Sequence, residues 1–334
     1  MIPSDATRRF LLPLAPGYQL ALALRELRLR AGWEAVRKLH FPVVSVGSLS
    51  AGGAGKTPLT IALARALTRR GRAVDVLSRG YGRTSRQAAR VAPSGGAEAY
   101  GDEPLLIAQA AGVPVYVAAQ RYEAGLLAEA ADAPSKAVRV HLLDDGFQHR
   151  QLYRDVNILL IDARDWFAER LLPAGNLREP LPAIRRASVL AIPAPDAPQL
   201  EPALRSHGWH GPIWRLHRRM EIPPIDGPVA AFCGIARPAQ FFGGLESAGL
   251  RLVMRAAFPD HHRYSAREID RIASDARNAG AVALVTTEKD RVRLGGVAVP
   301  LTLHTARLRI EIDDEQAALD WVEERLAGAA APHS

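Results

Sequence analysis

Short apolar runs alternate with stretches of helical periodicity from residue 42 onward. In the first half the apolar runs are Pro42–Val46, Ala73–Leu77, Val113–Val117, Val138–Leu143, Val156–Ile161 and Val189–Ile192. The helical stretches among them are Thr57–Arg70, Glu103–Ala111 and Arg121–Ala131. Runs such as Val156–Ile161, apolar almost throughout, are typical of strands in a parallel sheet covered on both faces. The pattern predicts an α/β fold with a mostly parallel sheet.

The same alternation returns after a proline-rich stretch that begins at Pro193. The expected strands of the second half are Val229–Cys233, Leu252–Ala256 and Ala283–Thr286, and the expected helices are Pro238–Gly249, Ser265–Ala279 and Glu315–Leu326. Two successive α/β patterns predict two units. We place the larger at residues 42–205 and the smaller at residues 206–328, after an N-terminal segment at residues 1–41.

The N-terminal segment contains a predicted helix, Tyr18–Leu39, with two apolar stripes. At about 100° per residue, one stripe gathers Leu20, Leu24, Leu27 and Ala31, and the opposite stripe gathers Leu22, Leu29, Trp33 and Val36. Two structures fit this pattern. The helix packs between two protein surfaces, or it packs one stripe on the protein and the other in a lipid interface.

Composition and charge narrow the functional classes. The chain has 334 residues, 48% of them hydrophobic, and a single cysteine, Cys233, so an internal disulfide and a cysteine-rich metal site are excluded. The net charge is +8, and residues 1–41 carry seven basic side chains against three acidic ones. Such a surplus suits nucleic acid, anionic lipid or a phosphorylated substrate. Without zinc-finger spacing or a basic stripe interleaved with aromatics, nucleic acid is not expected as a partner.

The strongest local signal for chemistry lies between a predicted strand and a predicted helix. It consists of Ser50, Ala51, Gly52, Gly53, Ala54, Gly55, Lys56 and Thr57. Glycines let backbone N–H groups wrap a phosphate chain, and the helix N-terminus favours negative charge. Lys56 is expected to reach the β- and γ-phosphates, and Thr57 to offer its hydroxyl to Mg²⁺. Ser50 stands where the usual P-loop has its first glycine.

A nucleotide-bound Mg²⁺ needs a further carboxylate, and two strand ends offer one. Asp144 and Asp145 follow one apolar strand, and Asp162 follows the next. Adjacent carboxylates raise each other's pKa unless a cation neutralises them, which favours Asp144 and Asp145 as the metal site. The guanine-reading pattern N-K-x-D is absent, because Lys289 and Asp290 are adjacent. ATP is therefore expected over GTP.

Three further polar clusters lie where strand ends should converge. Asp102 opens a helix, where capping is the alternative to a chemical role. His261 and His262 follow a predicted strand of the second half, with a stray exposed pair as the alternative. The segment 173–180 is rich in polar groups, and Arg178 within it could bind an anion.

Taken in order, these segments resemble the tetraacyldisaccharide 4'-kinases of lipid A biosynthesis, from about residue 10 to residue 325. The matching motifs are Gly-Gly-x-Gly-Lys-Thr-Pro at 52–58, Ser-Arg-Gly-Tyr-Gly-Arg at 78–83, Gly-Asp-Glu-Pro at 101–104, Leu-Asp-Asp-Gly-Phe-Gln-His at 143–149, Leu-Pro-Ala-Gly-x-Leu-Arg-Glu-Pro at 172–180, Phe-Cys-Gly-Ile-Ala-Arg-Pro at 232–238, Phe-Pro-Asp-His-His-x-Tyr at 258–264 and Thr-Thr-Glu-Lys-Asp at 286–290. Ser48 departs from the family, which usually has Asn there.

The resemblance implies transfer of the γ-phosphoryl group of ATP to the 4'-hydroxyl of a tetraacylated glucosamine disaccharide 1-phosphate. It implies two α/β domains across a cleft, and an N-terminal helix at the cytoplasmic face of the inner membrane. It pairs Asp102 with His261 as the catalytic base, places Asp144 and Asp145 near Mg²⁺, and places Arg121 near the phosphates. The acceptor side implied by the family motifs consists of Tyr81, Gln148, His149, Asn176, Arg178 and Glu179.

Two other functional classes compete with this interpretation. A P-loop ATPase acting as a switch or partner-loading factor would hydrolyse ATP slowly without a small acceptor. A nucleic-acid-binding protein with incidental ATP binding has only the net charge in its favour. The lipid kinase needs a membrane surface and the lipid acceptor, and no obligate protein partner is evident.

Overall fold

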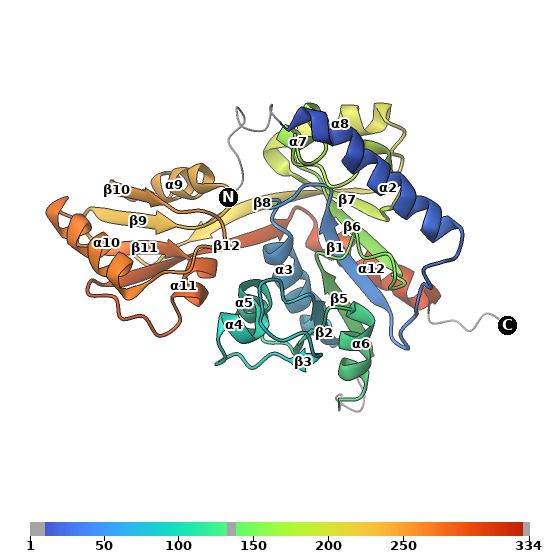
Figure 1. Ribbon diagram of the computed structural model, residues 1–334, viewed down its shortest axis with the longest axis horizontal. Coiled ribbons are helices and arrows are strands. Elements are labelled where there is room, and N and C mark those ends of the chain that lie inside the picture. The colour runs from blue at the N-terminus through green and yellow to red at the C-terminus, as the bar shows by residue number, and fades with distance from the viewer. Residues whose placement is uncertain (1–10, 132–137, 330–334) are drawn as a thin grey trace.

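The computed structural model describes residues 11–131 and 138–329. Within this part of the chain the strands form one twelve-stranded sheet in the order β10-β9-β11-β12-β8-β7-β6-β1-β5-β2-β4-β3 (Figure 1). Of its described pairings, only β8–β12 and β3–β4 are antiparallel. The predicted α/β fold with a mostly parallel sheet is therefore confirmed.

The first lobe is built on strands β1 to β7 and the helices that cover them. The strands are β1 (Val43–Ser48), β2 (Ala73–Ser78), β3 (Ala89–Arg90), β4 (Val115–Val117), β5 (Arg139–Asp144), β6 (Val156–Leu160) and β7 (Val189–Pro193). The helices are α3 (Lys56–Arg69), α4 (Ala97–Tyr100), α5 (Asp102–Ala111), α6 (Arg121–Glu129), α7 (Ala163–Ala168) and α8 (Ala197–Ser206), with 3₁₀ turns η2 (Leu181–Arg186) and η3 (Ala194–Asp196). Most predicted elements begin and end within a few residues of these bounds.

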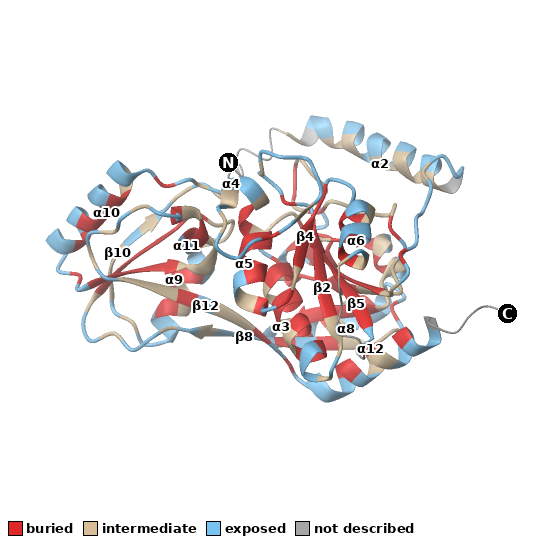
Figure 2. Cartoon of the chain, turned by 90° about the horizontal axis from the view of Figure 1, so that it is seen from below, coloured by how far each residue is buried: buried red, intermediate tan, exposed pale blue. Residues whose placement is uncertain are grey.

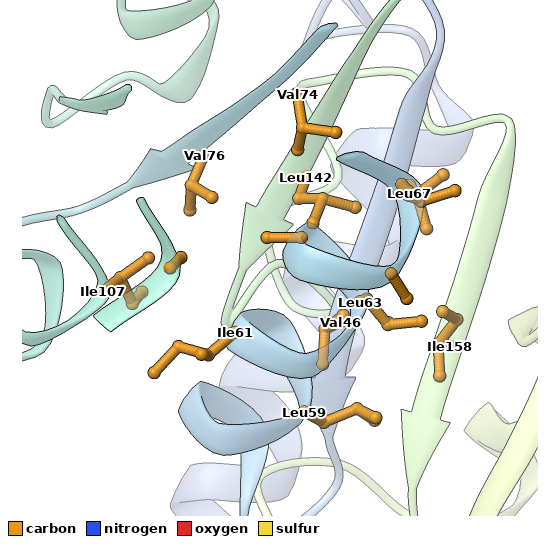
Figure 3. Close-up of a cluster of buried hydrophobic side chains, with 14 of the residues drawn as sticks. Val46, Leu59, Ile61, Leu63, Leu67, Val74, Val76, Ile107, Leu142 and Ile158 are labelled. Atoms are coloured by element: carbon orange, nitrogen blue, oxygen red, sulfur yellow. The ribbon is translucent and has the colours of Figure 1, made fainter. Parts of the chain in front are cut away.

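Helix α3, which follows the glycine loop, is anchored by an apolar face. Leu59, Leu63 and Leu67 are almost completely buried and share one core with Val46 of β1 and Ile158 of β6 (Figure 3). The spacing of four residues between these leucines places them on one side of the helix. The packing fixes the N-terminus of α3 relative to the ends of the central strands.

The second lobe contains β9 (Val229–Cys233), β10 (Leu252–Ala257) and β11 (Ala283–Thr287), with α9 (Pro238–Ser247), α10 (Ala266–Asn278) and α11 (Glu288–Leu294). Helix α10 begins with a capping box, in which Ser265 and Glu268 satisfy each other's backbone N–H groups. Phe232 and Ile269 are fully buried in the core between strands and helix. The second lobe thus has its own hydrophobic core.

Two long strands, β8 (Ile213–Glu221) and β12 (Leu303–Ile312), join the lobes (Figure 1). Strand β8 pairs with β7 at its start and with β12 further on, and β12 pairs with both β11 and β8. Neither strand was predicted. Buried Trp214 and Leu216 alternate with exposed Arg215 and His217, which is a strand pattern, but the following run of charged side chains obscures it.

The closing helix, α12 (Glu315–Ala329), returns to the first lobe. Its Leu319 and Val322 are buried in the first core, and Asp320 pairs with Arg70 of the first lobe at 2.5 Å. By its position in the sequence, nearly all of helix α12 falls within the predicted second unit, 206–328. Its buried side chains, however, belong to the core of the first lobe.

The N-terminal helix is shorter than predicted. After the 3₁₀ turn η1 (Leu12–Leu14), α2 spans Ala15–Arg30 and ends before Gly32, which adopts a φ of 71°. Trp33 and Val36 therefore lie beyond the helix. On α2 itself, the stripe of Leu20, Leu24 and Leu27 is 60%, 49% and 63% exposed. Arg8 and Arg9 of the basic segment lie outside the described residues.

Among the described residues, no helix is long and apolar enough to span a bilayer.

Replacing Leu63 with Ala should destabilise the first lobe by about 2–5 kcal/mol, because it leaves a cavity against the central strands. Urea unfolding, followed by near-ultraviolet circular dichroism, measures this change. Leu126→Ala, the same substitution at a position that is 46% exposed, should change the free energy of unfolding by less than about 1 kcal/mol. Equal effects would show that α3 is not anchored as described.

Candidate active site

The glycine loop between β1 and α3 has the backbone of a phosphate-binding loop. Gly52, Gly53 and Gly55 adopt φ angles of 81°, 69° and 94°, which side chains rarely tolerate. Ser50 has no positive φ, and it forms a bridge with Leu177. A side chain is therefore tolerated where the usual motif has its first glycine. Helix α3 begins at Lys56, directly after the last glycine of the loop.

The loop is held by the predicted acceptor segment. The N–H group of Ala51 donates to the carbonyl oxygen of Asn176 at 2.8 Å, and the N–H group of Arg178 donates to the carbonyl oxygen of Leu49 at 2.7 Å. The Asn176 side chain donates to Asp165 Oδ1 at 2.8 Å. The structure therefore brings the nucleotide loop and the 172–180 segment together through the backbone.

Asp144 and Asp145 lie at the end of β5, beside the start of α3. Asp144 accepts a hydrogen bond from Thr60 Oγ1 at 3.1 Å and is almost completely buried. Burial raises the pKa of Asp144 to about 7, and the neighbouring carboxylates of Glu103 and Asp145 add to this shift. A buried carboxylate of this kind is stabilised in its charged form by a cation.

Asp145 faces two cations. Lys56 Nζ lies 3.5 Å from Asp145 Oδ1, and Arg178 Nη1 donates to both carboxylate oxygens at 2.9 and 2.8 Å. Burial acts to raise the pKa of Asp145, but Lys56 and Arg178 outweigh it and lower the pKa. Arg178 also donates to Gln148 Oε1 at 3.3 Å. Four predicted site residues therefore meet at one point.

The carboxylate pair fits a magnesium ion bound together with a nucleotide. Within residues 11–131 and 138–329, no group of three His, Cys, Asp or Glu side chains forms a cation site by itself. Mg²⁺ in kinases is held by one or two carboxylates and by substrate phosphates and water. Adjacent carboxylates beside a phosphate-binding loop supply the protein's share of such a site.

Asp102 and His261 meet across the two lobes. Asp102 is the first residue of α5, one position after its N-cap Gly101, and its Oδ2 lies 3.0 Å from His261 Nδ1. The hydrogen bond to Asp102 raises the pKa of His261. Burial acts to raise the pKa of Asp102, but His261 and Arg293 outweigh it and lower the pKa. Capping therefore does not explain Asp102. The ring of Tyr81, 64% exposed, lies 5.5 Å from that of His261.

Arg121 is buried near the carboxylate pair, and His149 is half-buried close to Arg121. Burial and the neighbouring Arg79 lower the pKa of Arg121 to about 10, which leaves it cationic, and its Nε has no hydrogen-bond partner among the residues that the structure describes. Burial and nearby arginines lower the pKa of His149 to about 3, so its imidazole is neutral at pH 7. Glu179 forms an ion pair with Arg186 rather than joining the group around Asp145.

Four charged residues at the site were not predicted. Glu103 of α5 pairs with Lys289 of α11, and Arg293 contacts Asp102. Arg237 Nη1 lies 2.5 Å from Asp162 Oδ2, and its side chain packs so closely on the loop that a Cβ at Gly53 would lie 2.7 Å from Arg237 Nε. Asp162, the rejected metal candidate, thus anchors a cation of the second lobe. Three of the four residues lie within family motifs: Glu103 in 101–104, Arg237 in 232–238 and Lys289 in 286–290.

A glycine-rich loop between a strand and a helix, beside paired carboxylates at the neighbouring strand end, is the arrangement of a P-loop nucleotide-binding protein. The model of the tetraacyldisaccharide-1-P 4'-kinase family matches residues 7–327, and the chain belongs to this family. The predicted family is therefore confirmed, and the protein is a phosphotransferase.

Curated relatives carry the same description. A tetraacyldisaccharide 4'-kinase of Koribacter versatilis is 42% identical over 93% of this chain and 97% of its own length. One of Geobacter metallireducens is 38% identical over 92% of this chain and 96% of its own length. The crystal structure of LpxK from Aquifex aeolicus in complex with ATP matches with a TM-score of 0.76 and 33% identity, over 96% of this chain and 99% of that one.

Replacing Asp145 with Asn should raise the Mg²⁺ concentration for half-maximal activity about 10-fold or more, because a charged oxygen ligand is lost. Asp162→Asn, the control at the next strand end, should leave that concentration within about twofold. Initial rates across a Mg²⁺ titration at saturating ATP measure both. The opposite ranking would place the metal at Asp162.

Proposed function

We propose that this chain transfers the γ-phosphoryl group of ATP to the 4'-hydroxyl of a tetraacylated glucosamine disaccharide 1-phosphate, with Asp102 and His261 as the proton-accepting pair. ATP and Mg²⁺ are its cofactors. The observation that carries the assignment of the pair is the 3.0 Å contact between Asp102 Oδ2 and His261 Nδ1, which joins residues 159 positions apart in the chain.

The phosphate side of the reaction is assigned to the loop and to two cations. Backbone N–H groups of residues 50–57 cradle the phosphates, and Lys56 and Arg121 offset their charge. A bound Mg²⁺ would neutralise negative charge on the phosphate oxygens. Thr57, Asp144 and Asp145 would hold it. Glu103 lies close enough to raise the pKa of Asp144, so a bound cation beside Asp144 would favour its charged form.

The hydroxyl side of the reaction is assigned to the cross-lobe pair. An isolated aspartate has a pKa near 4 and is a weak base toward a sugar hydroxyl. A histidine bonded to it orients the carboxylate and shares the proton. Because Asp102 lies on the first lobe and His261 on the second, the pair is complete only when the lobes are together. This limits attack by water on the γ-phosphate.

The acceptor is proposed to lie along Tyr81, Gln148, His149, Asn176, Arg178 and Glu179. Tyr81 borders His261, and Arg178 borders Asp145, so the set reaches from the base to the metal side. The neutral imidazole of His149 can accept a hydrogen bond from a sugar hydroxyl. A set of polar side chains of this kind suits the headgroup of a disaccharide.

Helix α2 links this acceptor side to a lipid surface. On its inner face, Tyr18 Oη donates to the carbonyl oxygen of Arg178 at 2.8 Å, and Arg25 donates to the carbonyl oxygen of Gln148. On its outer face, Leu20, Leu24 and Leu27 are exposed. An apolar stripe flanked by arginines suits the headgroup boundary of a bilayer. We therefore propose peripheral binding to the inner membrane, on the cytoplasmic face where ATP is present.

Replacing Leu20, Leu24 and Leu27 together with Gln should weaken sedimentation with anionic vesicles by about 10-fold or more, because the buried apolar area is lost. Replacing Leu126 and Leu127 of α6 with Gln is the control, since both are exposed elsewhere. It should sediment like the wild type. Wild-type sedimentation of the α2 variant would exclude this stripe as the lipid contact.

Asp102→Ala and His261→Ala should each lower kcat by about 10²–10⁴, the scale of general-base catalysis. The double variant should be scarcely slower than the slower single variant, because a pair that acts as one unit loses its function once. Phosphorylation of the disaccharide measures the rates, and equilibrium ATP binding, which should barely change, is the control. Multiplicative losses would show two independent roles.

A further inference from the structure

Helix α11 of the second lobe places two cations against two consecutive carboxylates of the first lobe. Lys289 and Arg293 are four residues apart and therefore lie on one face of the helix. Lys289 pairs with Glu103, and Arg293 pairs with Asp102. Helix α11 and helix α5, which carries the two carboxylates, lie side by side in both views (Figures 1 and 2).

Arg293 makes the closest contacts to Asp102. Its Nε and Nη2 lie 2.7 and 2.6 Å from Asp102 Oδ2, the same oxygen that contacts His261 Nδ1 at 3.0 Å. Arg293 Nη2 also lies 3.3 Å from His261 Nδ1. Only 3% of the Arg293 side chain is exposed. The guanidinium therefore fixes where the carboxylate lies and which of its oxygens meets the imidazole.

Arg293 is itself held by a buried carboxylate. Asp290 is fully buried, and its Oδ1 accepts from Arg293 Nη1 at 3.0 Å, from Tyr264 Oη at 3.0 Å and from the N–H group of Gly234 at 3.1 Å. The carbonyl oxygen of Gly234 accepts from the N–H group of His261 at 3.2 Å and also from Arg293. Asp290 thus ties Arg293 and the His261 loop into one rigid unit.

We propose that Arg293 is a positioning residue for the phosphoryl transfer, which sets the geometry and charge of the Asp102–His261 pair when the second lobe meets the first. This inference rests on the proposed role of that pair. It also explains the 286–290 motif. Asp290 orients Arg293, and Lys289 pairs with Glu103, which is next to Asp102 on α5.

The charge of Arg293 gives a readout that a purely structural role would not produce. The groups facing Asp102 are His261, Arg293 and, more distantly, Lys289, while Asp260 and Asp290 face Arg293. The pair is active as a base only in its deprotonated form, which a nearby positive charge favours. Removing that charge makes the pair bind its proton more tightly. The acid limb of the kcat profile should therefore move to higher pH.

The test compares Arg293→Met, Arg293→Lys and the control Arg291→Met in the disaccharide phosphorylation assay from pH 5 to pH 9. Arg291 lies on the same helix and is exposed. We expect Arg293→Met to lower kcat at pH 7 by about 10–100-fold, the usual scale for a residue that orients an active group, and to shift the acid limb upward. Its KM for ATP should change less than about threefold.

Arg293→Lys keeps the charge but not the paired donors, so we expect a wild-type acid limb with a reduced kcat. It also covers the case in which Arg293→Met does not fold, as judged by thermal melting. Arg291→Met should match the wild type throughout. A folded Arg293→Met with an unchanged acid limb, or an Arg293→Lys that shifts it equally, would overturn the inference. Full activity of Asp102→Ala would instead overturn the role of the pair itself.

Discussion

Buried carboxylates at the edge of a parallel sheet need cations, and this need organises the structure. Asp144 ends β5 and Asp145 follows it, and Asp102 and Glu103 begin α5, so four acids gather at the same edge. An unpaired buried charge is strongly destabilising. Lys56 and Arg178 of the first lobe face Asp145, and Lys289 and Arg293 of the second lobe face Glu103 and Asp102. The lobes are therefore held together by ion pairs that include residues of the proposed site.

The connection between the lobes allows this pairing with little shared core, although Val292 of α11 packs into the core of the first lobe. Strands β8 and β12 run from one lobe to the other as an antiparallel pair, while the apolar clusters on either side remain largely separate. Their contacts at the site are mainly charged: Arg237 with Asp162, Arg218 with the carbonyl oxygen of Ala54, and α11 with α5. Charged contacts respond to an incoming anionic nucleotide and its cation, whereas a continuous apolar core would not.

Much of this arrangement was predictable from local pattern. Apolar runs predicted the parallel strands, and the structure contains them. The glycine loop and the adjacent Asp144 and Asp145 could be picked out as a candidate phosphate site and a candidate cation site, because each signal is confined to a few neighbouring residues. The contact of Asp102 with His261 came only from the family resemblance, since no local pattern links residues 159 positions apart. Arg293 and Arg237 were missed because their roles depend on how one lobe faces the other. Strands β8 and β12 were missed because their partners are equally remote, and the end of α2 at Gly32 was missed because apolar residues continue the stripe beyond it.

The central claim is that the site transfers a phosphoryl group to a lipid-linked sugar and does not merely hydrolyse ATP. The most direct measurement follows the label from γ-³²P-ATP in the presence of the tetraacyl disaccharide 1-phosphate and Mg²⁺, with products separated by thin-layer chromatography. The account predicts one label per disaccharide, located on the 4'-oxygen, with little free phosphate. Release of labelled phosphate at the same rate with and without the disaccharide, and no labelled lipid, would contradict it and identify an ATPase.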